Sequence, residues 1–173
     1  MIIKAATKVA LLGAMSAVFT SNLMSQDFLF RSNIVGSNPK TIIAGVQSGG
    51  APWTVQRGSA RLNDDGRLRV ELRDLILPNL GNPGPVTNVS ASLVCGGAGG
   101  TVVATTDPVP LSGDGNAEIE GKISSSGVCF APIVLIQAAG FNGTLLQQPG
   151  PWIAATGFAQ VPDASGDKED EGK

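Results

Sequence analysis

The chain has 173 residues, of which 42% are hydrophobic and 15% charged, and its formal net charge is −2 at pH 7. A charge so close to neutral gives no electrostatic reason to expect nucleic acid or an anionic membrane as a partner, and this apolar fraction is too high for a disordered body. The sequence contains no histidine, which excludes Ser-His-Asp and Cys-His nucleophile systems and histidine-ligated metal sites. We therefore expect a non-enzymatic protein without a cofactor or a bound metal.

The first 25 residues have the composition of a secretory signal peptide. Lys4 and Lys8 precede an apolar run from Val9 to Phe19, and small or polar residues follow that run. A basic start, an apolar core of about 7–15 residues and a small-residue exit are typical of export signals, whereas a membrane span needs about 20 apolar residues. We expect a secreted or cell-surface protein with no stable membrane span. The alternative is an apolar N-terminus without a targeting role.

Short segments rich in Val, Ile, Leu and Thr, separated by Gly-rich turns, indicate an all-β protein after the signal peptide. We expect a spacer over residues 26–40, one β-sandwich domain over 41–160 and a disordered acidic tail over 161–173, because the tail is highly charged and has no apolar period. The expected strands are Thr41–Val46, two arms of a hairpin between Trp53 and Leu77, Val86–Cys95, Thr101–Thr106, Ala117–Ile123, Val128–Ile136 and Trp152–Phe158, with a long loop over Gln137–Gly150.

The clearest local prediction is the hairpin. On its second arm Leu68, Val70 and Leu72 alternate with charged residues, which is the period-2 pattern of a half-buried strand. If Leu62 pairs directly with Leu68 so that both face the core, the connection must contain an odd number of residues. The sequence therefore predicts a three-residue loop in which Gly66 takes the left-handed conformation.

Cys95 and Cys129 are the only cysteines in the chain, and we expect them to form a disulfide. In an exported chain, two cysteines with no third usually form one structural bridge, whereas a redox pair normally has the close C-x-x-C spacing. A bridge that closes a loop of about 34 residues stabilises the fold by roughly 4 kcal/mol in the chain-entropy account.

Roughly seven to nine short strands at a spacing of about 8–12 residues predict an antiparallel β-sandwich, immunoglobulin-like in the broad sense, with a small β-barrel as the runner-up. Residues Gly49–Val70 combine Gly-Gly, Pro-Trp and Asp-Gly with alternating Leu and Val, and Cys129–Ile136 reads CFAPIVLI. In these motifs, residues 49–158 resemble uncharacterised exported bacterial β-sandwich proteins. The resemblance implies the fold and the compartment but no activity.

Every arginine except Arg31 lies between Arg57 and Arg73. In the predicted register Arg61 faces Arg69 and Arg57 faces Arg73 on the solvent side, and like charges directly opposite each other are unfavourable. An acidic polysaccharide, a phosphate or an acidic protein would compensate them, since arginine forks bind carboxylates and phosphates. The alternative is a solvated face balanced by neighbouring carboxylates. The candidate ligand face comprises Arg57, Arg61, Arg67, Arg69 and Arg73, and the candidate balancing residues are Glu71, Asp74, Glu118 and Glu120.

Two further features have both a binding and a packing interpretation. The pattern P-W-x4-G occurs twice, and its rings, Trp53 and Trp152, suit either sugar stacking or core packing. The loop over residues 137–151 either binds a partner or folds back over the core. Its large apolar residues are Phe141, Leu145 and Leu146.

We expect a secreted binding or structural surface module whose ligand is an anionic glycan or a protein. Two other functions stay open. In a carboxylate-dependent glycan hydrolase, Asp107, Glu118 or Glu120 would have to converge with carboxyl groups about 5–9 Å apart. In a surface assembly, exposed strand edges would join neighbouring subunits. The acidic turns at 63–66 and 114–116 lack the EF-hand pattern, so turn formation explains them without calcium.

Overall fold

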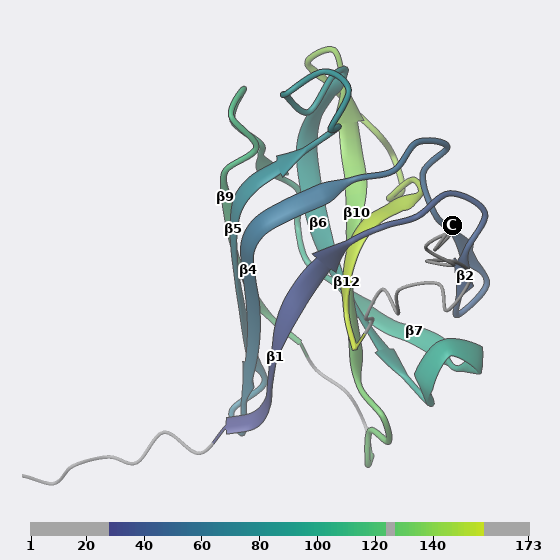
Figure 1. Ribbon diagram of the computed structural model, residues 1–173. Helices are drawn as coiled ribbons and strands as arrows, with labels where there is room; N and C mark the ends of the chain where they lie inside the picture. Colours follow the sequence, from purple (N-terminus) through teal and green to yellow (C-terminus); the bar gives the residue numbers. More distant parts are fainter. Residues whose placement is uncertain (1–27, 124–126, 158–173) are drawn as a thin grey trace, which may run out of the picture.

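Alternating apolar and polar residues form one curled antiparallel sheet in the computed structural model, which describes residues 28–123 and 127–157 (Figure 1). The strands run in the order β7-β6-β10-β12-β1-β4-β5-β9, β8 pairs with β6 and β11 with β10, and β2 and β3 form a separate ribbon. In chain order the elements are β1 (Phe28–Gly36), β2 (Ile42–Ile43), β3 (Val46–Gln47), β4 (Thr54–Asn63), β5 (Arg67–Ile76), β6 (Val86–Cys95), the 3-10 turn η1 (Gly97–Gly99), β7 (Thr101–Thr105), β8 (Val109–Pro110), β9 (Ala117–Lys122), β10 (Ile133–Phe141), β11 (Thr144–Leu145) and β12 (Trp152–Thr156).

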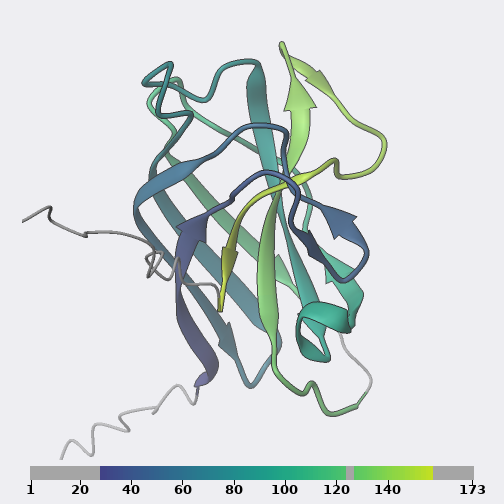
Figure 2. The same ribbon diagram turned by 45° about the vertical axis from the view of Figure 1, so that its right-hand side comes forward.

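β1 joins the two halves of the sheet, which face each other across the core (Figure 2). Its residues up to Asn33 pair with β4, and Ile34 to Gly36 pair with β12. The strand order is therefore continuous, and the sheet has the shape of a half-barrel. The predicted all-β antiparallel class is confirmed, whereas the division into the two separate sheets of a sandwich is not confirmed.

The concave side of the sheet holds the main core. Leu68, Val70 and Leu72 of β5 are fully buried, and they belong to one cluster with buried residues of β6 and β10 from the other half of the sheet. Fully burying a side chain of this size contributes about 1.5–3 kcal/mol. Leu62 pairs with Leu68 and Gly66 has a φ of 81°, so the predicted register and three-residue loop are confirmed.

A smaller apolar cluster lies on the outer side of the sheet, where the β2–β3 ribbon packs against it. Trp152, Val94 and Leu135 from three adjacent strands are fully buried in this cluster, and Ile43 of β2 packs with them. The backbone N–H of Gly49 donates to the carbonyl of Trp152 at 2.9 Å and holds the end of the ribbon against β12. β12 is consequently buried on both faces.

The first part of the described chain differs from the prediction in two places. The segment 26–40, expected to be a spacer, contains the central strand β1, which lacks a sustained period because it changes its pairing partner midway. The single strand expected over Thr41–Val46 is wrong. Ala44 and Gly45, with φ values of 52° and 75°, reverse the chain there and produce the β2–β3 ribbon.

The strand expected over Val128–Ile136 is β10, which begins at Ile133 and lies between β6 and β12. Ala131 has a φ of 43°, and Pro132 has no backbone N–H for the ladder. Cys129 and Ala131, which the expected strand included, therefore precede the strand.

The long loop expected over Gln137–Gly150 is also wrong. β10 continues to Phe141, which pairs with Thr144 of β11. Asn142 and Gly143, with φ values of 50° and 81°, form the two-residue turn between these strands, and Asn-Gly is a preferred sequence for such turns.

The sulfurs of Cys95 and Cys129 lie at bonding distance, with Cα atoms 5.0 Å apart, which confirms the predicted pair. The bridge ties the end of β6 to the segment that leads into β10, so it links two strands that are neighbours in the sheet. The expected signal peptide and the expected acidic tail lie outside the described residues.

Gly66→Val should lower the free energy of unfolding. A non-glycine residue held at positive φ costs about 1–3 kcal/mol, and a Cβ at this position would lie 2.4 Å from the carbonyl oxygen of Ile123. Urea unfolding should be compared with that of Gly113→Val, a turn glycine with open space at its Cβ position. Equal stability of the two variants would contradict the register.

Replacing Cys95 and Cys129 together by serine should lower the free energy of unfolding by about 4 kcal/mol, because the bridge closes a sequence separation of 34 residues. Urea unfolding of the native protein in reductant should match that of the double variant. A loss below about 1 kcal/mol would show that the bridge does not constrain the unfolded chain as proposed.

Candidate functional site

The outward residues of β1, β4, β5 and β9 form a face rich in arginine, which we call the arginine face. The register places Arg31, Arg61 and Arg69 side by side on three neighbouring strands, and Glu120 of β9 ends this row. Over these described strands, together with Asp65 of the β4–β5 turn, the charged residues leave a surplus of two positive charges. The charged residues are Arg31, Arg57, Arg61, Arg67, Arg69, Arg73 and Lys122 against Asp65, Glu71, Asp74, Glu118 and Glu120.

Three arginines of the face have carboxylate partners. The ion pairs are Arg73–Glu118 at 3.1 Å, Arg69–Glu71 and Arg69–Glu120 at 3.4 Å, and Arg67–Asp65 at 3.9 Å. Every side chain in these pairs is at least 40% exposed, so each pair contributes at most about 1 kcal/mol. Neighbouring carboxylates therefore balance the positive charge of these three arginines, as the solvated-face alternative predicts.

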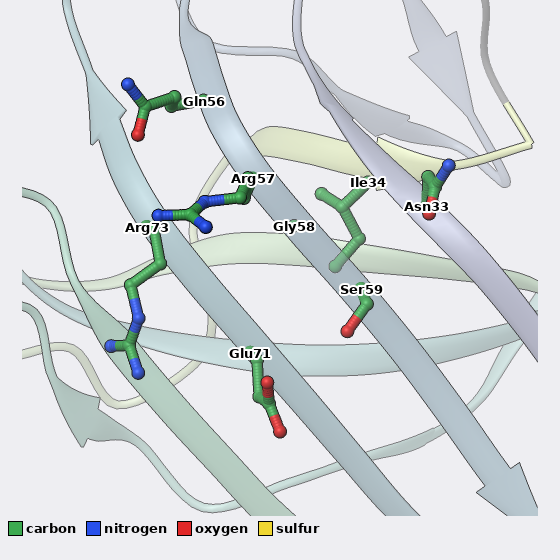
Figure 3. Close-up of a pocket in the computed structure, with 8 residues that line it drawn as sticks. All are labelled: Asn33, Ile34, Gln56, Arg57, Gly58, Ser59, Glu71 and Arg73. Carbon is green, nitrogen blue, oxygen red and sulfur yellow. The ribbon is translucent and has the colours of Figure 1, made fainter.

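Arg57 lies at a groove with a volume of about 620 Å³ on the arginine face (Figure 3). Arg73 lies beside it across β4 and β5, and no ion pair within the described residues involves Arg57. The other polar side chains of the groove can donate and accept hydrogen bonds around the guanidinium. They are Asn33, Gln56 and Ser59, together with the carboxylate of Glu71.

The groove forms because β1 and β4 separate where β1 changes partners. The two strands pair at Asn33 and Ser59, and they meet again where the N–H of Trp53 donates to the carbonyl of Ser37 at 2.9 Å. Between these points β4 contains two more residues than β1, and such extra residues bend a strand away from its partner. Gly36 permits the second meeting, since a Cβ there would lie 2.0 Å from the carbonyl oxygen of Trp53.

Arg61 has an unmet hydrogen-bonding requirement. Its Nε–H is buried without a hydrogen-bond partner among the described residues, whereas buried polar groups nearly always have one. Its direct neighbours across the strands, Arg31 and Arg69, are both cations. An anion over this row would accept hydrogen bonds and reduce the repulsion.

The predicted binding-loop residues lie in the other half of the sheet. Phe141 ends β10 and packs partly buried against the main core, as the packing interpretation predicts. Leu145 of β11 is 57% exposed, and Leu146 is partly buried. The structure therefore does not bring these residues to the arginine face.

The carboxylates considered for hydrolysis do not line the groove. Glu118 and Glu120 point outward from β9 and are bound by Arg73 and Arg69, whereas Asp107 follows β7. Over residues 28–123 and 127–157, no group of three or more metal-ligating side chains could hold an ion.

A second cavity, of about 610 Å³, opens between the β4–β5 turn and the segment before β10. The sequence does not predict this cavity, because the apolar run before β10 is typical of a strand. Its lining is mainly apolar and includes Leu29, Phe30, Leu62, Leu93, Ile123, Val128 and Pro132, with Asp64, Asp65 and Lys122 as charged members.

Arg31 and Asn33 are members of the face that the sequence pattern did not predict. Both lie in the segment expected to be a spacer. The signal that could have found them is the pair of β-prone runs around them, Phe28–Phe30 and Ile34–Val35. Together these runs indicate a strand with polar residues at its middle.

Both tryptophan rings are buried. Trp53 is 5% exposed in the main core, and Trp152 is 0% exposed under the β2–β3 ribbon. These positions fit the core-packing interpretation, and neither ring is available as a platform for sugar stacking.

The sequence matches no protein-family model, and the searches of curated proteins and of solved structures found no match. In the part of the chain that the structure describes, no helix is long and apolar enough to cross a membrane.

Acrylamide should quench the fluorescence of the native protein weakly, because its only two tryptophans, Trp53 and Trp152, are buried. The Stern–Volmer constant should rise severalfold in urea, where both rings are exposed. Quenching of the native protein as strong as that of the unfolded chain would contradict the packing.

Proposed function

We propose that the protein is an exported, non-enzymatic module that binds an acidic polysaccharide through the arginine face. One observation carries the proposal: Arg31, Arg57 and Arg61 form no ion pair with a described residue, although they lie on a face with surplus positive charge. A disulfide in an all-β chain is compatible with an extracellular location. In this proposal the curled sheet serves as an immunoglobulin-like sandwich scaffold in the broad sense.

The geometry favours a ligand with several anionic groups. Neighbouring strands lie about 4.7–4.9 Å apart, so Arg31 and Arg61, which have no ion pair with a described residue, offer two positive charges on adjacent strands. Guanidinium forks bind carboxylates in a bidentate manner. The amides and the hydroxyl at the Arg57 groove suit the several alcohol groups of a sugar ring. An acidic polysaccharide supplies both kinds of group.

The surface-assembly alternative has one supporting observation. β7 lies at an edge of the sheet, carries no charged residue and has Val102 and Val103 exposed. However, the register with β6 shifts between Leu93 and Val94, and a bulge at an edge hinders pairing with another chain. The arginine face is therefore the better-supported site.

The mature protein should bind a polyuronate or heparin matrix at low ionic strength and elute by about 0.5 M NaCl, because salt screens exposed charges. Arg57→Gln and Arg61→Gln should each weaken binding about 3–10-fold, which corresponds to about 0.7–1.4 kcal/mol. Lys40→Gln, a control that removes one charge from the loop before β2, should leave binding unchanged. No retention of the native protein, or equal weakening in all three variants, would overturn the proposal.

A further inference from the structure

The sequence that follows the last described strand is acidic where the arginine face is basic. Between Asp163 and Glu171 it carries five carboxylates and one lysine, a net charge of −4, and this segment lies outside the described residues. The arginine face has a surplus of two positive charges, and three of its arginines form no ion pair with a described residue. We propose that this acidic segment binds the arginine face of its own chain and competes there with external polyanions.

β12 brings the chain to the arginine face. Thr156, the last residue of β12, pairs with Ile34 of β1, and Ile34 lines the groove that holds Arg57. β12 therefore ends beside β1, and β1 separates Gly157, the last described residue, from β4. On β4, Arg57 lines the groove and has no ion pair with a described residue.

The acidic segment has the reach to cover the face. The six residues from Gly157 to Asp163 span at most about 20 Å when extended, and the nine residues from Asp163 to Glu171 span about 30 Å. The four strands β1, β4, β5 and β9 together cover only about 14 Å between the outer axes. The segment can therefore cross every strand of the face.

Tethering makes weak ion pairs sufficient for this contact. Covalent attachment through a few residues gives an effective concentration in the millimolar range, so exposed pairs that are each worth at most about 1 kcal/mol can hold the segment at low salt. The bound carboxylates would also reduce the electrostatic repulsion among the neighbouring cations Arg31, Arg61 and Arg69. An external polyanion would have to displace the segment. This competition rests on the proposed function, whereas the intramolecular contact does not.

Zero-length carbodiimide crosslinking tests the contact in the mature chain without any ligand. Lys122 lies on the arginine face, and Lys40 lies on the loop before β2, so they serve as target and control. In monomeric protein at about 20 mM NaCl, mass spectrometry should find Lys122 joined to carboxylates between Asp163 and Glu171 at least about fivefold more often than Lys40. The Lys122 product should fall about fivefold in about 0.5 M NaCl, and also when Arg57 and Arg61 are both replaced by glutamine. Equal yields at both lysines, yields that salt does not change, or products found only in dimers would overturn the contact.

A full-length variant with a neutral segment tests the competition. Its substitutions are Asp163→Asn, Asp167→Asn, Glu169→Gln, Asp170→Asn and Glu171→Gln. Its affinity for polyuronate at low salt should exceed that of the native chain about 5–10-fold, and the difference should vanish at about 0.5 M NaCl. Crosslinks without polyuronate binding by either form would support the contact and overturn the proposed function. Polyuronate binding that is equal in both forms would overturn the competition.

Discussion

The pairing of Leu62 with Leu68 across the β4–β5 turn is the constraint on which the rest of the structure depends. Because successive strand residues point to opposite faces, this register sends the leucines of the hairpin into the core and its arginines to solvent. A slip of one residue would turn Arg69 and Arg73 inward, and an unpaired buried charge costs several kcal/mol. Arg61 and Arg69 remain opposed because separating them would also separate Leu62 from Leu68.

β1 gives the arginine face its shape. By pairing first with β4 and then with β12, this strand carries the sheet from one half of the half-barrel to the other. The same change of partner separates β1 from β4 and leaves the groove at Arg57. The strand β1 therefore closes the core and also creates the groove on the surface. The position of the candidate site follows from the way β1 connects the two halves of the sheet.

The strands with a regular alternation of apolar and polar residues are those that the sequence predicts well. β6 has the expected bounds Val86–Cys95, and β9 and the β4–β5 hairpin agree closely with the expectation. β10 is buried on both faces, so its apolar run has no period, and its limits are set instead by Pro132 and the Asn142–Gly143 turn. The sequence does not predict β1, because the first half of this strand pairs with β4 and its second half pairs with β12.

The same reasoning applies to the site. The opposed arginine pairs follow from the hairpin register, which is local and readable from alternation alone. Arg31 and the polar side chains of the groove depend on the contact between β1 and β4, which are separated along the chain by the β2–β3 ribbon. No local pattern specifies such a contact. The sequence therefore predicts the charge of the face but not its outline.

The most direct test of the account is a nuclear magnetic resonance titration of the isotope-labelled mature protein with a short uronate oligosaccharide at low salt. The largest shifts of backbone and arginine side-chain signals should fall at Asn33, Arg57, Ser59 and Arg61. Shifts concentrated at Phe141–Leu146, or no shifts at millimolar oligosaccharide, would contradict it.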